Sequence, residues 1–224
     1  KNSDLFPEFK ADVRKWMVQE VEAFARNTIQ RDKASFAAFL TTPKTTITPP
    51  LAPIYGQEKF TGTKELDAGS ERIGIISLPG VIAAQSSDSE TAPLHRALFL
   101  QSRIMCATLP PPPDDVGDVA EPDPKLTSRE RFEAHSSNTL CKGCHVRMDP
   151  YGFSLEHFDP IGRFRTMEND KPIDASGEIK DAESANGKFT SAKDLFPKFA
   201  NDLVAQKCFV QNVFRYLNGR MPDK

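Results

Sequence analysis

The sequence predicts a mainly α-helical protein with long proline-rich loops. Apolar residues recur at three- and four-residue steps near both ends of the chain, which is the period of an amphipathic helix. Prolines are concentrated in two stretches between these segments, where they exclude regular helix. Hydrophobic residues make up 38% and charged residues 27% of the 224 residues, which is typical of a globular protein with one or two domains.

The N-terminal part is expected to contain two helices, over residues 6–27 and 32–40. We interpret the apolar stripe of the first helix as part of a core rather than as a cofactor-binding surface. That stripe consists of Leu5, Phe9, Val13, Trp16, Met17, Val21 and Phe24.

The middle of the chain is expected to be mostly connector. Residues 41–60 are rich in proline and threonine, and four consecutive prolines from Pro110 predict a stiff polyproline II strap on the surface. Between them, the pattern predicts a polar loop over residues 63–70, a strand or a short buried segment over 73–76, the beginning of a short helix over 81–84 and a longer helix over 91–109.

Further helices are expected in the C-terminal part. Thr127 is placed as an N-cap, and Glu130 completes a capping box three residues later. This helix runs to His135 and leads the chain to Cys141. After a polar loop over residues 172–187, helices are expected over residues 191–199 and 207–217, with Asn218-Gly219 as the C-cap.

Cys141, Cys144 and His145 form the pattern Cys-x-x-Cys-His, which is the attachment motif of a c-type haem (heme c). Each thiol adds to one vinyl group of the porphyrin, and one helical turn brings both sulfurs to the two vinyl carbons. The histidine is then the proximal iron ligand through Nε2. Its other ring nitrogen needs an acceptor, usually a backbone carbonyl, to fix the tautomer. We therefore expect one covalently attached haem.

Two other interpretations of the motif are weaker. A zinc site would need two further ligands, and Cys106 and Cys208 lack the paired spacing of a zinc ribbon. A thioredoxin-like redox pair is expected to follow a strand, whereas residues 127–140 are polar and helical in pattern.

Cys106 and Cys208 are the two cysteines outside the motif. Haem c is attached outside the bacterial cytoplasm, in a compartment that also permits disulfides. We therefore expect a periplasmic or extracellular protein. A Cys106–Cys208 disulfide would tie the middle of the chain to its last helix, and two buried free thiols are the alternative.

Charge and hydropathy bear on other partners. The net charge of −2 gives no reason to expect binding to nucleic acid or to an anionic membrane surface. No segment is apolar enough to span a bilayer. The chain starts at Lys1 without a methionine or a signal peptide, so we expect it to be part of a longer polypeptide.

Short motifs spread over nearly the whole chain occur together in one family. They are residues 51–56, 93–96 with Cys106, 127–135, 141–145, 148–150, 152–153, Glu156, 158–159, Gly162, 174–177, Cys208, Tyr216, Gly219 and Arg220. With these motifs the chain resembles large planctomycete-type c-type cytochrome proteins, whose domains are mostly described as of unknown function. The resemblance implies an extracytoplasmic redox protein, and in some relatives an attachment to carbohydrate-active modules.

The order of elements is also similar to that of a class I cytochrome c fold. A helix precedes the motif, loops with proline and glycine follow it, and a C-terminal aromatic helix would cross the first helix. We expect residues 127–224 to form this cytochrome c-like haem domain. Residues 1–126 would form a helical partner segment packed on it. The resemblance supplies no known reaction.

The sixth iron ligand decides between electron transfer and small-molecule chemistry. Met167 follows a turn at about the point where a cytochrome c chain reaches the distal side of the haem, so we predict it as the ligand. His135 and a vacant position are the alternatives. Arg163 and Arg165 are candidates to bind the haem propionates, because a guanidinium matches a carboxylate. The porphyrin is expected to be lined by Tyr151, Phe153, Phe158 and Phe164.

The leading hypothesis is a monohaem c-type cytochrome that passes single electrons to or from a redox partner protein. Family analogy suggests a polysaccharide-active oxygenase or an oxidase as that partner. The alternative is a haem enzyme, a peroxidase or oxygenase, with an open sixth coordination position. A third hypothesis is a glycan- or partner-binding N-terminal segment, but Trp16 lies on an apolar stripe and does not suggest a sugar platform.

Overall fold

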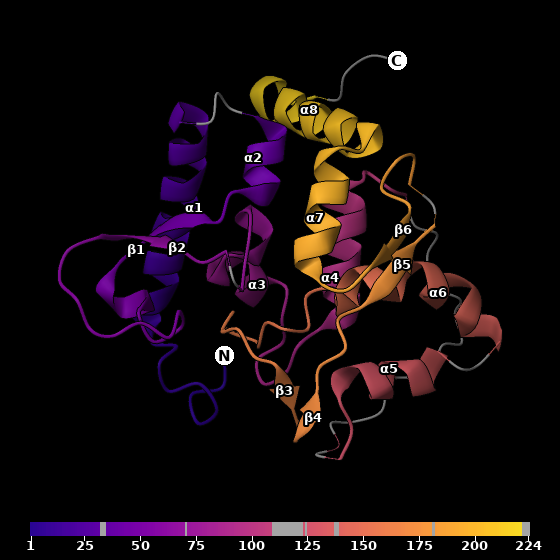
Figure 1. Ribbon diagram of the computed structural model, residues 1–224, viewed down its shortest axis with the longest axis horizontal. Helices are drawn as coiled ribbons and strands as arrows, with labels where there is room; N and C mark the ends of the chain where they lie inside the picture. Colours follow the sequence, from indigo (N-terminus) through magenta and orange to yellow (C-terminus); the bar gives the residue numbers. More distant parts are fainter. Residues whose placement is uncertain are drawn as a thin grey trace.

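Helices dominate the architecture, which confirms the predicted mainly α class (Figure 1). The computed structural model describes residues 1–31, 35–69, 71–108, 123, 125–136, 139–180 and 182–220. Within these ranges the helices are α1 (Ala11–Arg31), α2 (Phe36–Thr41), α3 (Pro79–Ala84), α4 (Pro93–Phe99), α5 (Ser128–Ser136), α6 (Thr139–Phe153), α7 (Ala192–Ala200) and α8 (Leu203–Asn218). The proline run from Pro110 lies outside the described residues.

In the part of the chain that the structure describes, three short antiparallel strand pairs join these helices, at places where no strand was expected. They are β1 (Lys44–Ile47) with β2 (Lys64–Asp67), β3 (Met167–Glu168) with β4 (Lys171–Pro172), and β5 (Gly177–Ile179) with β6 (Gly187–Phe189). Strands of two to four residues are too short to give a readable alternation, so the sequence carried little sign of them.

Of the two alternatives for residues 73–76, the strand is wrong and the short buried segment is confirmed, with Ile76 buried and Ile73 and Ile75 partly buried against the core. A 3₁₀ turn, η2 (Ile75–Ser77), occupies this place, after Gly74 with a φ of +69°. A Cβ atom at Gly74 would lie 2.2 Å from the carbonyl oxygen of Leu40, so only glycine permits this approach to α2. The chain therefore turns here instead of extending.

The N-terminal helix begins five residues later than predicted, at Ala11. Val13, Met17 and Phe24 are buried as expected, while Leu5 remains 53% exposed. This helix packs on β1, α3 and the 3₁₀ turn η1 (Pro49–Leu51), and its apolar face forms a smaller core with residues that include Ile47 and Ile161. The stripe is thus part of the core.

A larger core lies between α2, α4, α6 and α7. It contains Leu40 and Leu100 together with Phe196 and Phe199, all buried. The smaller core likewise contains Ile161 beside residues of α1. Residues on both sides of position 126 therefore contribute to both cores, and the division into segments 1–126 and 127–224 stays a prediction.

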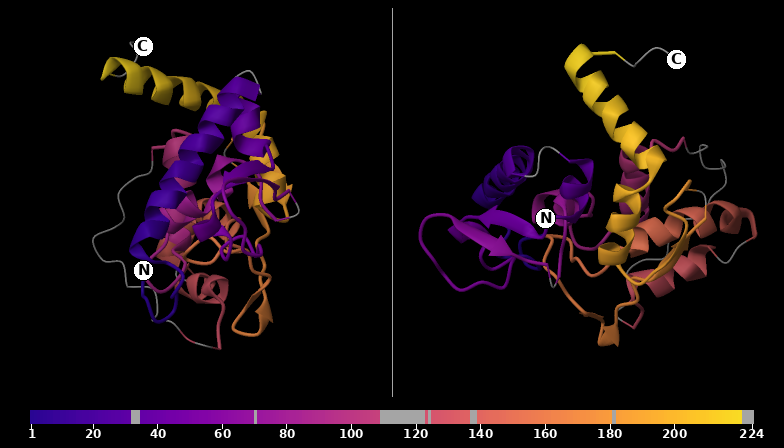
Figure 2. Two further views of the ribbon diagram at one scale, coloured as in Figure 1. Left: turned by 90° about the vertical axis from the view of Figure 1, so that its left-hand side faces the viewer. Right: turned by 45° about the horizontal axis from the view of Figure 1, so that its top comes forward.

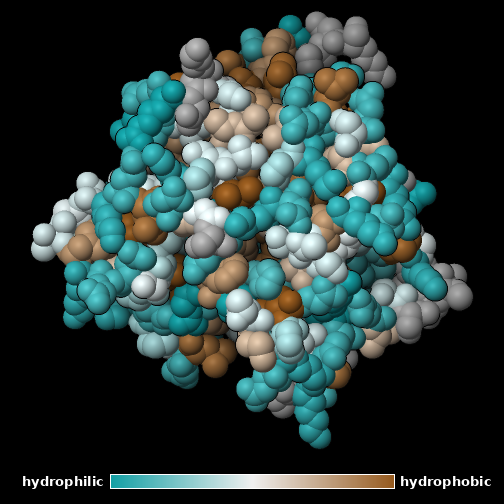
Figure 3. Space-filling model, viewed as in Figure 1, coloured by the Kyte–Doolittle hydropathy of each residue, from teal (hydrophilic) through white to brown (hydrophobic). Residues whose placement is uncertain are grey.

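The last helix, α8, projects from the body of the molecule (Figure 2). It is capped by Asp202 at its start and by Gly219 in the left-handed conformation at its end, which confirms the predicted glycine C-cap. Apolar surface gathers over it (Figure 3), and the exposed large apolar residues there are Leu203, Val210, Val213, Tyr216 and Leu217. Of the described helices, none is long and apolar enough to cross a membrane.

The expected crossing of the last helix over the helix from Thr127 is wrong. Among the described elements, α8 packs on α7 and on η3 (Leu100–Ile104), a π-helical turn, whereas α5 packs on α6. Figure 1 shows α8 and α5 at opposite ends of the molecule.

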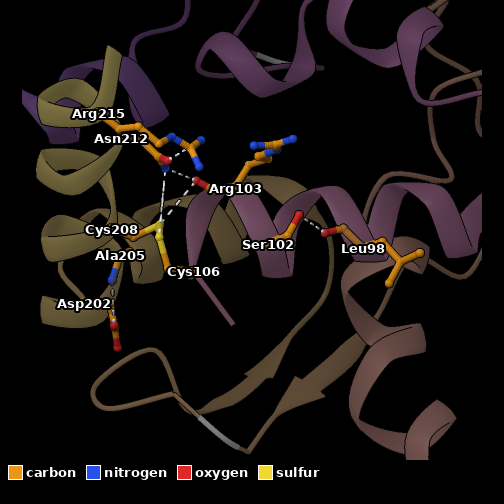
Figure 4. The surroundings of a disulfide bond; sticks show 9 residues. All are labelled: Leu98, Ser102, Arg103, Cys106, Asp202, Ala205, Cys208, Asn212 and Arg215. Carbon is orange, nitrogen blue, oxygen red and sulfur yellow. Dashed lines mark hydrogen bonds between the residues drawn. A yellow bond between two sulfur atoms is a disulfide. The ribbon is translucent and has the colours of Figure 1, made fainter. Parts of the chain in front are cut away.

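A disulfide between Cys106 and Cys208 fastens α8 to the segment after η3, which confirms that prediction. Their Cα atoms are 5.4 Å apart. Asn212 lies beside the disulfide and donates to the carbonyl oxygen of Arg103 at 3.1 Å (Figure 4). Because the bond closes a long loop, it should limit the freedom of the unfolded chain.

Candidate haem-attachment site

The Cys-x-x-Cys-His motif lies inside α6, which continues to Phe153. This helix contains Pro150, although proline has no N–H to donate within a helix. In the structure Pro150 is accommodated, and the N–H of Ser154 bonds to its carbonyl oxygen at 3.2 Å. The motif is therefore carried by a regular helix whose far end is fixed in the core.

The surface around the motif is open. Cys144 is an exposed free thiol, and Lys142, Val146 and Arg147 are exposed around it. A Cβ atom at Gly143 would meet no atom of the described residues within 4 Å, apart from its chain neighbours and the backbone of its own helix. The side chain of Cys141 lies outside the described part of the chain. One side of this helical turn is thus free to receive a bulky group.

His145 is held by a carboxylate of its own helix. Its Nδ1 lies 2.8 Å from Oδ1 of Asp149, four residues later. Both side chains are largely buried, and burial raises the pKa of Asp149 while the hydrogen bond with His145 opposes the rise. With the Nδ1 proton in this bond, Nε2 carries the free lone pair. The expected backbone acceptor is replaced by a carboxylate.

The ring of His135 on α5 lies beside that of His145. The ring centroids are 5.4 Å apart and the planes meet at 73°. The predicted capping box fixes the start of α5: the N–H of Thr127 donates to Glu130 at 2.7 Å, and the N–H of Glu130 donates to Oγ1 of Thr127 at 3.2 Å. The structure thus places His135, the alternative candidate for the sixth ligand, beside His145, the expected proximal ligand.

Met167 is not brought to His145. It lies on β3 and is 48% exposed. Figures 1 and 2 show β3 well away from the first turns of α6. Its role as an iron ligand stays a prediction.

Arg163 and Arg165 are engaged with carboxylates of the chain itself. Arg163 pairs with Asp159 at 2.6 Å and with Glu8. Arg165 pairs with Glu168 at 3.3 Å and lies 3.6 Å from Glu156. These pairs hold the turn after α6, so propionate binding by either arginine would require an exchange of partners.

The aromatic residues expected to line a porphyrin are also packed within the protein. Tyr151 stacks on Phe199 with centroids 5.8 Å apart. The Phe158 ring lies under the guanidinium of Arg72, at 5.0 Å. Phe153 is buried, with the guanidinium of Arg129 at 4.8 Å from its ring.

A buried ion pair, Arg96–Glu156, anchors the end of α6 to α4. Arg96 is fully buried and donates to Glu156 at 3.0 Å and to the carbonyl oxygens of Leu155 and Phe158. Thr91 donates to the other carboxylate oxygen of Glu156 at 2.8 Å. Burial raises the pKa of Glu156, and the guanidinium of Arg96 opposes the rise. Sequence reasoning missed this network, because 60 residues separate its two charges and neither belongs to a local pattern.

The fold and site together describe a mainly α-helical protein with a Cys-x-x-Cys-His turn in which Cys144 is exposed. Residues 72–168 match PSCyt3, a family described as a protein of unknown function (DUF1588), and residues 1–57 match PSD4, likewise described as a protein of unknown function (DUF1592). Both are planctomycete cytochrome-like families, in keeping with the resemblance found in the sequence. No curated protein and no solved structure shows significant similarity to the chain.

Proposed function

We propose that this chain is an extracytoplasmic monohaem c-type cytochrome that transfers single electrons to or from a redox partner protein. The observation that carries the proposal is the turn of α6 in which an exposed Cys144 precedes a carboxylate-held His145. When bound there, haem supplies a reversible one-electron change at iron.

The residues of this turn fit a c-type haem by their chemistry. Cys141 and Cys144 would tether the ring, and Nε2 of His145 would hold the iron. Asp149 orients the imidazole and raises its basicity through the bond to Nδ1. The space over Gly143 is free of other side chains of the described residues, so the attachment face is accessible.

The disulfide supports the proposed compartment, since such bonds persist outside the cytoplasm. A periplasmic or extracellular place suits both the disulfide and the attachment of haem c. The proposed partner, a polysaccharide-active oxygenase or an oxidase, rests on family analogy alone.

Covalent attachment tests the proposal directly. The chain is produced in a host with c-haem machinery, denatured, and examined by mass spectrometry and by the absorbance of its pyridine haemochrome. We expect one haem per chain, retained after denaturation, and its loss or partial loss in Cys144→Ala. The matched control is the double variant Cys106→Ala/Cys208→Ala, which removes two cysteines outside the motif and should keep the haem. A wild-type chain without bound haem would refute the proposal.

The sixth ligand can be assigned on the same material. Methionine ligation gives a weak absorption band of ferric haem at about 695 nm. Loss of that band in Met167→Ala would support Met167. A spectrum that is unchanged in Met167→Ala but altered in His135→Ala would assign His135, whose ring already lies beside His145.

A haem enzyme with an open sixth position is the second candidate. The Asp149–His145 bond favours it, because a carboxylate partner strengthens electron donation by the histidine. This candidate predicts a high-spin ferric spectrum that changes on addition of cyanide or peroxide. A low-spin spectrum that changes with neither cyanide nor peroxide would contradict this candidate and support the electron carrier.

A further inference from the structure

A groove with a volume of about 770 Å³ lies between α6, the β5–β6 pair and α7. This size falls within the range of about 300–1,000 Å³ that is usual for small-molecule sites. Of the motif residues 142–145, whose side chains the structure describes, none lines it, although Val146 directly follows His145. We call it the lysine groove, after Lys180, Lys188 and Lys198 on its rim.

The floor of the lysine groove is apolar. It is formed by Val146, Pro150 and Phe189, and Val146 is 52% exposed. Gly177 keeps this floor closely packed, since a Cβ atom there would lie 2.6 Å from the Phe189 ring and 2.9 Å from Cβ of Pro150. An apolar group in the groove would therefore cover surface that is now exposed to water.

The residues that line the groove carry more positive than negative charge, with Arg129 and the three lysines against Glu178 and Asp194. Lys180 pairs with Glu178 at 3.2 Å, and the N–H of Thr190 donates to Asp194 at 2.9 Å. In the described ranges neither Lys188 nor Lys198 forms an ion pair within 4 Å of a carboxylate, although the charge of Lys198 helps to lower the pKa of Asp194. Two ammonium groups are thus available above an apolar floor.

We propose that the lysine groove binds an amphiphilic organic anion. The apolar, preferably aromatic, body of the ligand lies on Val146, Pro150 and Phe189. Its carboxylate or sulfonate lies at Lys188 and Lys198. The site goes beyond the proposed electron transfer and does not depend on it, because no haem ligand takes part.

Equilibrium dialysis with 8-anilinonaphthalene-1-sulfonate tests the proposal on the full chain at low salt. We expect saturable binding at one site that weakens as salt is added. Lys188→Gln/Lys198→Gln should bind the anion about tenfold more weakly, because the variant loses the attraction between its sulfonate and two ammonium groups. The matched control Lys10→Gln/Lys15→Gln removes two exposed charges from the region of α1 and should bind like the wild type.

A second pair of measurements distinguishes binding in the lysine groove from nonspecific binding to other apolar surface. Val146→Glu places a carboxylate on the exposed floor and should reduce binding at least as strongly. N-phenyl-1-naphthylamine, which has the same aromatic body without the sulfonate, should bind more weakly than the anion. Equal affinity of the two lysine double variants, or of the charged and uncharged ligands, would overturn the proposal. Absence of haem from the chain would refute the cytochrome proposal and leave this result untouched.

Discussion

The two halves of α6 lie in opposite surroundings. Between Lys142 and Arg147 most residues are exposed, whereas Tyr151, Gly152 and Phe153 are buried. The first half carries the motif, and the second half packs on α4 and leads into the Arg96–Glu156 pair. The difference teaches how this chain combines access with precision: one end of the helix is fixed by the core, so that the other end can hold His145 in place while its surface stays free.

The strongest test of this comparison is removal of the charge that fixes the buried end. Arg96→Met would leave the buried Glu156 with Arg165, 3.6 Å away, as its remaining cationic neighbour, at a cost of about 3 kcal/mol in the free energy of unfolding. Urea denaturation measures it. Arg14→Met, at an exposed position on α1, is the control and should change stability by less than about 0.5 kcal/mol. A loss below about 1 kcal/mol in Arg96→Met would show that the pair does not anchor the helix.

Glu20 is a second buried carboxylate, and unlike Glu156 it forms no ion pair with an arginine of the described residues. Glu20 is 2% exposed and accepts hydrogen bonds from Tyr55 and from Thr45, and burial raises its pKa to about 7. Glu20 therefore binds a proton more tightly in the folded state than in the unfolded state, where its carboxyl has a pKa of about 4.3. Stability should fall as the pH rises from about 4.5 to 7.

Glu20→Gln should remove this fall. Relative to wild type, its free energy of unfolding should gain up to about 3 kcal/mol between pH 4.5 and pH 7.5. Urea unfolding at the two pH values measures the difference. A difference between the two proteins that does not change with pH would mean that Glu20 has an ordinary pKa.

Two glycines of α6 allow the comparison to be made with the same substitution. At Gly152 a Cβ atom would lie 2.1 Å from the carbonyl oxygen of Pro93, so Gly152→Ala should destabilise by about 1–3 kcal/mol. At Gly143 the space is open, and Gly143→Ala should stabilise by about 0.5–1 kcal/mol because alanine favours helix. Thermal unfolding of both variants measures the two changes in stability. Shifts of the same sign would contradict the proposed contrast between the two halves.

A small effect is also expected where the two halves meet. Asp149→Asn keeps an acceptor oxygen near His145 but loses the charge, so unfolding should become easier by only about 0.5–1.5 kcal/mol. In the haem-loaded protein the weaker acceptor should raise the reduction potential. Potentiometric titration measures it, with the exposed Asp12→Asn as control. An unchanged reduction potential in Asp149→Asn would show that Asp149 does not influence the potential of the haem.

Local signals explain which parts could be predicted from the sequence. The capping box at Thr127, the glycine cap at Gly219 and the apolar face of α1 each depend on residues within one or two helical turns. The disulfide followed from counting cysteines and from the compartment. Long-range features had no such signal. The pairing of β1 with β2 and the Arg96–Glu156 pair join distant segments, and the place of Met167 depends on how the chain after α6 folds back.

The disulfide has a consequence for a protein exposed to proteases. Cys106 and Cys208 are 102 residues apart in the sequence, and the whole Cys-x-x-Cys-His motif lies between them. A single cut anywhere in that interval leaves two pieces that are still covalently joined. A nicked molecule would therefore migrate as one species on a denaturing gel without reductant and as two with it, and the piece bearing the motif would not be lost by dilution.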